Sequence, residues 1–176
     1  MSNPDLPDAT TTDIPLLETV SSDVNEITET HRMLAEVAAA AVEVGYFPVV
    51  GDNQCDFLIS LPHNCSLDGY ITFPDKGRPT AYLGNWNVNE KLRGNGIGRR
   101  LMEKFNQQAG MIGIAEISTS AVSPEGLRGV SSYFGFENLE ILGIDAEKFK
   151  GMSLQRLLAL MESGSERGYA LKIKIR

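Results

Sequence analysis

The chain has 176 residues, 42% of them hydrophobic, which is enough to bury one core and too little for two comfortable domains. It has no apolar run of about 20 residues and no basic-then-apolar N-terminus, so we expect neither a membrane partner nor a secretory signal, and a cytoplasmic location is favoured. The net charge of −7 disfavours nucleic acid as a partner. Much of this charge comes from a segment, residues 1–23, without lysine or arginine: Asp5, Asp8, Asp13, Glu18 and Asp23.

The two cysteines give little support to a metal site. Cys55 and Cys65 have no histidine at metal-ligand spacing, so no metal is expected and free thiols are favoured.

The N-terminal region divides into a lead segment and a helix. Residues 1–20 combine three prolines with a threonine run, which predicts a flexible acidic segment, and the domain is then expected over 21–176. From 23 to 44, apolar or small residues recur at helical spacing, and Gly45 suits a helix stop. The residues that mark this face are Ile27, Leu34, Val37, Ala41 and Val44.

Residues 49–88 have a different hydrophobic pattern, in which short apolar runs are separated by turn residues. The runs 56–61, 69–73 and 81–88 predict strands of an antiparallel meander. The segment 75–79 predicts a hairpin connection, because Gly77 tolerates positive φ and Pro79 lacks an N–H for strand pairing.

Helical spacing returns after a glycine-rich segment, at Ile97, Leu101, Met102 and Phe105, and a strand is predicted at 112–117. The order strand, glycine loop, helix, strand favours a right-handed parallel crossover. Further on, we expect helices at 124–132 and 153–161, a strand at 139–142, and a lysine-bearing edge strand at 169–176.

The glycine segment 93–98 has the properties of an anion cradle. Glycines at 94, 96 and 98 let the main chain approach a diphosphate, the start of a helix adds partial positive charge, and Arg93, Arg99 and Arg100 supply cations. A P-loop is excluded because no Gly-Lys-Ser/Thr follows. Arg99 occupies the third glycine position of a Rossmann fingerprint, although Glu116 lies at roughly the acidic spacing of that fold.

The stretch WNVNEKLRGNGIGRRL at 86–101 resembles the acetyl-CoA signature of the GNAT superfamily of N-acetyltransferases, whose core is Arg/Gln-x-x-Gly-x-Gly/Ala. The flanking strand and amphipathic helix extend this resemblance over residues 81–136. It implies a single α/β (α+β) domain with a mixed, mostly antiparallel central sheet flanked by helices. It also implies acetyl-CoA as co-substrate.

The resemblance also assigns cofactor contacts. The main chain of Trp86, Asn87 and Val88 is expected to hold the pantetheine arm like an added strand. The diphosphate is expected on a second group of residues: Arg93, Gly94, Asn95, Gly96, Ile97, Gly98 and Arg99.

Two catalytic residues are carried over in the same way. Glu116, on the strand after the glycine-loop helix, corresponds to a general base of some relatives. Many relatives have a tyrosine acid four residues before a Gly-Phe pair; here Gly135-Phe136 is present but Ser131 occupies that position, so Tyr133 is the candidate acid. A salt-bridged Glu116 and a packing role for Tyr133 remain the alternatives. His31 and His63 lack an interpretable nucleophile spacing and are expected to be non-catalytic.

These observations predict an N-acetyltransferase that transfers acetyl from acetyl-CoA to a primary amine of a protein or small molecule, compatible with a homodimer. The first alternative is a catalytically weak or inactive CoA-binding or interaction module of the same fold. The second is a nucleotide-dependent oxidoreductase, supported only by the glycine pattern and Glu116.

Overall fold

The computed structural model describes residues 15–143 and 146–174, with side chains described from residue 26 onward. Most of the predicted lead segment therefore lies outside the described residues. Its last part, residues 15–20, belongs to the first helix.

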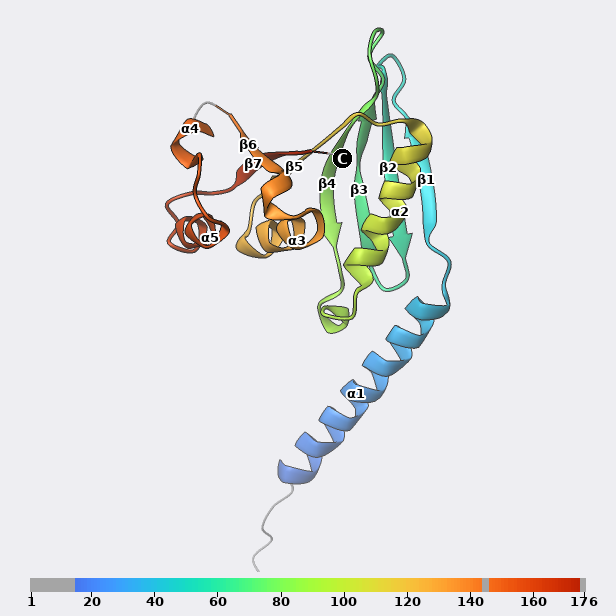
Figure 1. Ribbon diagram of the computed structural model, residues 1–176. Coiled ribbons are helices and arrows are strands. Elements are labelled where there is room, and N and C mark those ends of the chain that lie inside the picture. Colours follow the sequence, from blue (N-terminus) through green and yellow to red (C-terminus); the bar gives the residue numbers. More distant parts are fainter. Residues whose placement is uncertain (1–14, 144–145, 175–176) are drawn as a thin grey trace, which may run out of the picture.

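A seven-stranded sheet carries the helices of the domain (Figure 1). The elements in chain order are α1 (Pro15–Ala39), β1 (Glu43–Pro48), β2 (Gln54–Leu61), β3 (Cys65–Thr72), β4 (Thr80–Asn87), the 3-10 helix η1 (Glu90–Leu92), α2 (Ile97–Ile112), β5 (Glu116–Ala121), α3 (Pro124–Phe134), the 3-10 helix η2 (Phe136–Asn138), β6 (Leu139–Leu142), α4 (Ala146–Phe149), α5 (Leu154–Glu162) and β7 (Tyr169–Ile173).

The strand order is β1-β2-β3-β4-β5-β7-β6. Only β4 and β5 pair in parallel, through the crossover that contains α2, and the other neighbours are antiparallel. The predicted α/β class, the mixed and mostly antiparallel sheet, the parallel crossover and the 75–79 hairpin connection are confirmed.

The core lies on one face of the sheet. Alternate residues of β2 to β5 and β7 are buried on this face. Helix α2 covers them in one half of the sheet, and α3 and α5 cover them in the other half. All four residues predicted for the inner face of α2 are buried. The opposite face of the sheet is more open, since Leu58 and Tyr70 are 38% and 36% exposed.

The first helix differs from its prediction at both ends. It begins by Pro15 and ends at Ala39, and Val44 and Gly45 belong to β1 instead. Where the helix ends, the Arg100 guanidinium donates to the carbonyls of Val37 and Ala40, at 2.6 and 2.5 Å, and so satisfies acceptors that a helix end leaves unpaired. Figure 1 shows α1 running away from the sheet, so Ile27, one of the residues that mark the predicted apolar face of the helix, is 57% exposed.

Two strand predictions need correction. The strand predicted at 112–117 lies at Glu116–Ala121, because α2 continues to Ile112 and ends on Gly113, whose φ is +79°. The C-terminal strand is not an edge, since β7 lies between β5 and β6. Its Lys172 faces cross-strand partners instead of guarding an edge.

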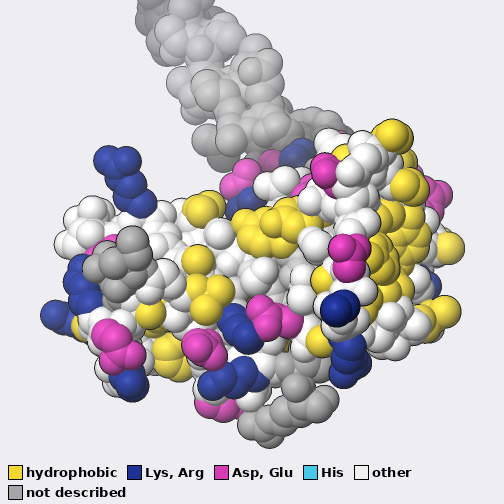
Figure 2. Space-filling view, turned by 90° about the horizontal axis from the view of Figure 1, so that it is seen from above, with side chains coloured by type: hydrophobic (Ala, Val, Ile, Leu, Met, Phe, Trp, Pro, Cys, Tyr) yellow, Lys and Arg dark blue, Asp and Glu magenta, His cyan; other side chains and the backbone are white. Residues whose placement is uncertain are grey.

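The surface has two different halves when seen from the hairpin end. Figure 2 shows hydrophobic side chains gathered on the side of β1 to β4, whereas charges of both signs are frequent on the side of α4 and α5. Exposed hydrophobic residues on the β1 to β4 strands and hairpins include Phe47, Val50 and Phe73. In the described part of the chain, no helix has the length and apolar character needed to span a membrane.

Candidate functional site

The two parallel strands part halfway along their length. Pairing runs from Thr80↔Glu116 to Leu83↔Thr119 and then stops. The Thr119 hydroxyl, in a buried side chain, closes the ladder by donating to the Leu83 carbonyl at 2.9 Å. Beyond this point the two strands border a cleft of about 930 Å³ that also reaches the glycine loop and α3. The edge of β4 beyond Leu83 is therefore not paired with β5 and borders the cleft.

A β-bulge explains why β4 turns away from β5. Between Leu67↔Trp86 and Gly69↔Leu83, β4 contains one more residue than β3, and Asp68 faces the extra length. Asp68 accepts the backbone N–H of Asn85 at 3.0 Å and its side-chain amide at 3.2 Å. A Cβ at Gly84 would lie 2.8 Å from Asp68 Oδ1, so a side chain at this position would displace the carboxylate from Asn85.

The glycine loop follows β4 and is anchored by the buried Leu92 of η1. Gly94 and Gly96 have φ of +80° and +75°, and an added Cβ at either position would meet no atom within 4 Å. Both glycines are thus required by the backbone, and the space outside them is open to a ligand.

The start of α2 supplies unpaired donors. Its first backbone bond runs from Arg100 N–H to the Gly96 carbonyl, and the N-cap Gly96 has no capping side chain. The N–H groups of residues 97–99 consequently have no acceptor within the helix. Together with the helix dipole they favour an anionic group at this end.

Gly98 has a different role from the other two glycines. A Cβ at this position would lie 3.1 Å from the Trp86 ring nitrogen, so Gly98 is constrained by the indole packed against it. Gly129 of α3 has the corresponding relation on the other side of the ring, at 3.4 Å. The expectation that all three glycines serve diphosphate approach therefore fits Gly94 and Gly96 better than Gly98.

The loop's polar side chains are used unequally. Arg93 is exposed and donates to the Val88 carbonyl, while Arg99 pairs with Glu103 one helical turn later, with 75% of its side chain exposed. Asn95 folds back and donates to the Leu92 and Arg93 carbonyls. Arg100, expected near the phosphates, is instead committed to the C-terminus of α1.

Glu116 and Tyr133 do not meet in the cleft. Glu116 begins β5 at the closed end of the ladder, about 13 Å along the strand from Ser120 in the cleft wall. Its carboxylate lies 2.5 Å from the Lys172 ammonium, and this hydrogen bond raises the pKa of Lys172.

Tyr133 faces a second cavity of about 760 Å³ between α2 and α3. Its hydroxyl accepts from the Asn106 amide at 3.1 Å, and its ring meets Trp86 edge-on. Burial raises the pKa of the Tyr133 phenol, which keeps it in its protonated form. Ser131, in the position of the family's usual tyrosine, is buried and its hydroxyl has no partner among the described residues.

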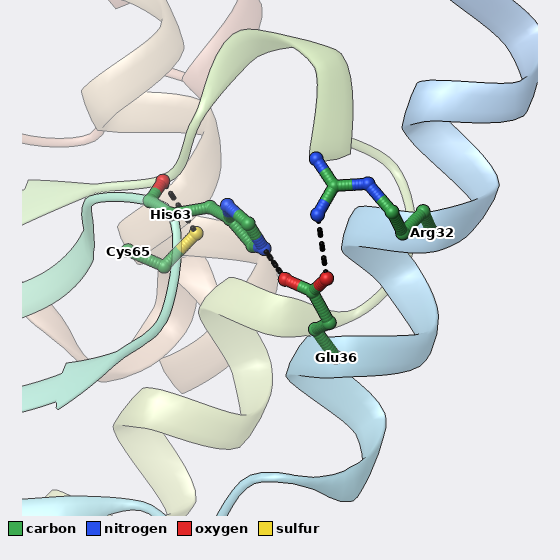
Figure 3. Close-up of polar contacts among 4 residues, drawn as sticks. All are labelled: Arg32, Glu36, His63 and Cys65. Carbon is green, nitrogen blue, oxygen red and sulfur yellow. Dashed lines mark hydrogen bonds and ion pairs between the residues drawn. The ribbon is translucent and has the colours of Figure 1, made fainter.

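A polar cluster joins α1 to the turn between β2 and β3 (Figure 3). Glu36 of α1 binds both Arg32, at 2.6 Å, and the His63 ring, at 2.7 Å. His63 and Asn64 have positive φ in the β2–β3 turn, and the Asn64 carbonyl accepts from Asn87 in the cleft wall at 2.7 Å. His63 is therefore part of a structural link between α1 and the cleft.

Sequence reasoning did not identify the residues that shape the cleft, chiefly Asp68, Gly84, Asn85 and Thr119. The available signal was the pair of glycines inside strands, Gly69 and Gly84, which is typical of a bulge.

A family model described as the acetyltransferase (GNAT) family matches residues 26–136. No curated protein matches the chain. Solved structures similar to it include Arabidopsis thaliana Naa50 in complex with a bisubstrate analogue, at 14% identity over 68% of this chain and 72% of that one, with a TM-score of 0.45. A putative acetyltransferase from Agrobacterium tumefaciens has 18% identity over 99% and 100% of the two chains and a TM-score of 0.42. A GNAT family acetyltransferase from Elizabethkingia anophelis with acetyl-CoA bound has 13% identity over 76% and 98% and a TM-score of 0.44.

Proposed function

Because the chain belongs to the acetyltransferase (GNAT) family, we propose that it transfers the acetyl group of acetyl-CoA to a primary amine of a small molecule or a protein. The observation that carries this proposal is the cleft that opens where β4 leaves β5, directly beside the glycine loop and the unpaired N–H groups of α2.

In this proposal the pantetheine arm lies along the free edge of β4 and pairs with its backbone, as an added strand would. The diphosphate lies at the open side of Gly94 and Gly96, against the first turn of α2. The proposed cofactor contacts are those expected from the sequence: Trp86, Asn87, Val88, Arg93, Gly94, Asn95, Gly96, Ile97, Gly98 and Arg99.

The reaction needs a neutral amine, which attacks the thioester carbonyl; the carbon–sulfur bond then breaks and the thiolate of CoA leaves. One proton must leave the amine and one must reach the thiolate. We retain Glu116 as the proposed base and Tyr133 as the proposed acid, and each role requires a rearrangement. Glu116 must leave Lys172 and act through bridging water, because it lies about 13 Å along the strand from Ser120 in the cleft wall. Tyr133 must reach past Trp86. Otherwise water carries the protons and proximity provides the acceleration.

The test measures both CoA binding and acetyl transfer. Native mass spectrometry of the purified protein is expected to show a CoA-sized adduct after incubation with acetyl-CoA, and acetyl-CoA consumption is expected to rise with at least one member of a panel of amines and peptides. Consumption that stays at background with every acceptor would argue against amine acetylation.

The role of Glu116 is tested against a matched neighbour. Glu116→Gln is expected to slow turnover at and above the optimum pH, where the unmodified carboxylate is free to accept a proton, and to flatten the acid limb of the pH profile, without a comparable loss of CoA affinity. Glu140→Gln is the control, because Glu140 also faces Lys172 across the sheet but has no proposed part in proton transfer. Equal pH profiles of the two variants would remove Glu116 from the mechanism.

One observation favours the second candidate, a CoA-binding module without efficient chemistry. The usual tyrosine position holds the buried Ser131, and the nearby Tyr133 hydroxyl is already bound to Asn106. Tight CoA binding with no turnover on any acceptor would support this module.

A further inference from the structure

Trp86 is the single tryptophan of the chain and stands between two cavities. Its side chain borders both the cleft of about 930 Å³ and the second cavity of about 760 Å³. It also packs against both hydrophobic clusters, the one under α2 and the one under α3 and α5.

The orientation of the indole is defined by the two helices beside it. The ring nitrogen lies against Gly98 in the first turn of α2, whereas the benzene edge lies against Gly129 of α3. Tyr133 contacts the ring edge-on, with the centroids 6.4 Å apart. The indole N–H is thereby held at the same helix start that carries the unpaired backbone donors.

This N–H has no acceptor in the described part of the chain. The nitrogen is buried, and no hydrogen-bond partner for it exists among the described residues. A buried donor without an acceptor is destabilising and uncommon in native proteins. Its neighbours at the start of α2 are also donors, so the group that is missing here is a hydrogen-bond acceptor.

We propose that the Trp86 side chain is a ligand of the bound cofactor: on binding, the indole turns out of its packing against Gly98 and donates its N–H, buried in the ligand-free protein, to an oxygen of the pantetheine–diphosphate part of CoA. This inference rests on the proposed function. The inference goes beyond that function, because the family signature led us to expect a role for the main chain of Trp86 and not for its side chain. The indole separates the two cavities and would contact the cofactor from its place between them. Cofactor binding should therefore change the environment of this ring.

The single tryptophan makes a direct spectroscopic test available. In ¹⁵N-labelled protein the indole N–H gives one cross-peak, and addition of CoA is expected to move its proton resonance downfield as the hydrogen bond forms. Pantetheine and ADP, titrated separately, distinguish an amide carbonyl from a diphosphate oxygen as the acceptor. A cross-peak that CoA leaves in place, at saturating concentration, overturns the proposal.

A second test removes only the N–H. Expression in a tryptophan auxotroph supplied with β-(3-benzothienyl)alanine replaces the indole nitrogen by sulfur at position 86 and nowhere else. Calorimetry is expected to show CoA affinity reduced roughly tenfold, while the ligand-free protein melts no earlier than the tryptophan form. Equal affinity overturns the proposal, as does an affinity loss matched by an equal loss of stability without ligand.

The two proposals fail in different ways. If the unmodified protein does not bind CoA by calorimetry, the proposed function fails. If it binds CoA while the indole resonance and the analogue's affinity are unchanged, only the role of Trp86 fails.

Discussion

Asp68 holds Asn85 by three hydrogen bonds, one to the backbone N–H at 3.0 Å and two to the side-chain amide at 3.2 Å. The two residues face each other across the β3–β4 bulge, so this contact fixes the point at which β4 departs from β5. The carboxylate of a β3 residue therefore shapes a cleft that it does not itself line.

Asp68→Ala is expected to loosen the bulge and weaken CoA binding about tenfold, because β4 loses the contact that sets its course. Destabilisation of about 1 kcal/mol should accompany it, since the pair is partly solvated. Asp68→Asn keeps one acceptor and is expected to lie between the two proteins. Calorimetry and urea unfolding measure both effects, and full CoA affinity in the alanine variant would refute the role.

Gly96→Leu is expected to abolish most CoA binding while the protein stays folded, because the side chain would fill the open space outside the loop. Gly164→Leu is the matched control. Gly164 has a φ of +72°, close to the +75° of Gly96, and the same open surroundings. Both variants should therefore lose similar stability from backbone strain, and a similar loss of CoA affinity in both would contradict a ligand site at Gly96.

Gly98→Ala is expected to displace the indole, because the new Cβ would lie 3.1 Å from its nitrogen. Overpacking of this kind costs about 1–3 kcal/mol and should change the emission of the single tryptophan. Gly110→Ala, in the same helix but with no atom within 4 Å, is expected to stabilise the protein by about 0.5–1 kcal/mol and leave the emission unchanged. Thermal melts and fluorescence spectra of the two variants compare these outcomes, and unperturbed emission in Gly98→Ala would contradict the packing argument.

Alanine variants of the neighbouring Arg99 and Arg100 should have different effects, one on ligand binding and the other on stability. Arg100→Ala leaves the carbonyls of Val37 and Ala40, at and just after the end of α1, without their donor and is expected to cost about 2 kcal/mol of unfolding free energy. Arg99→Ala removes an exposed i,i+4 pair and should change stability by less than about 0.5 kcal/mol. CoA affinity should fall mainly in Arg99→Ala, and the reverse pattern would show that the two roles were exchanged.

Docking of α1 should depend on pH through Glu36. The hydrogen bond from His63, opposed by slight desolvation and aided by Arg32, lowers the pKa of this carboxyl. A lowered folded-state pKa means that the stabilisation is present above the ordinary pKa of glutamate and is lost as the pH falls through the folded value. Acid titration of stability is expected to be flatter in Glu36→Gln than in the unmodified protein, and identical acid profiles would exclude this contribution.

Local sequence determined the elements around the glycine loop. The 3.6-residue spacing of Ile97, Leu101 and Phe105 identified α2 and its buried face, and the signature at 86–101 identified the family. These features were readable because backbone φ at glycines and the period of a helix depend on neighbours within a few residues.

The roles within the loop were decided by tertiary structure. Gly98 is explained by Trp86, twelve residues earlier, and Arg100 by the end of α1, about sixty residues earlier. Likewise β7 became an inner strand because β6 pairs with its free side, and Asp68 shaped the cleft from another strand. The sequence by itself thus specified a glycine loop, its helix and its family. The cleft wall, the bulge and the partner of each charged side chain required the fold. Packing and hydrogen bonding join residues whose separation along the chain carries no periodic signal.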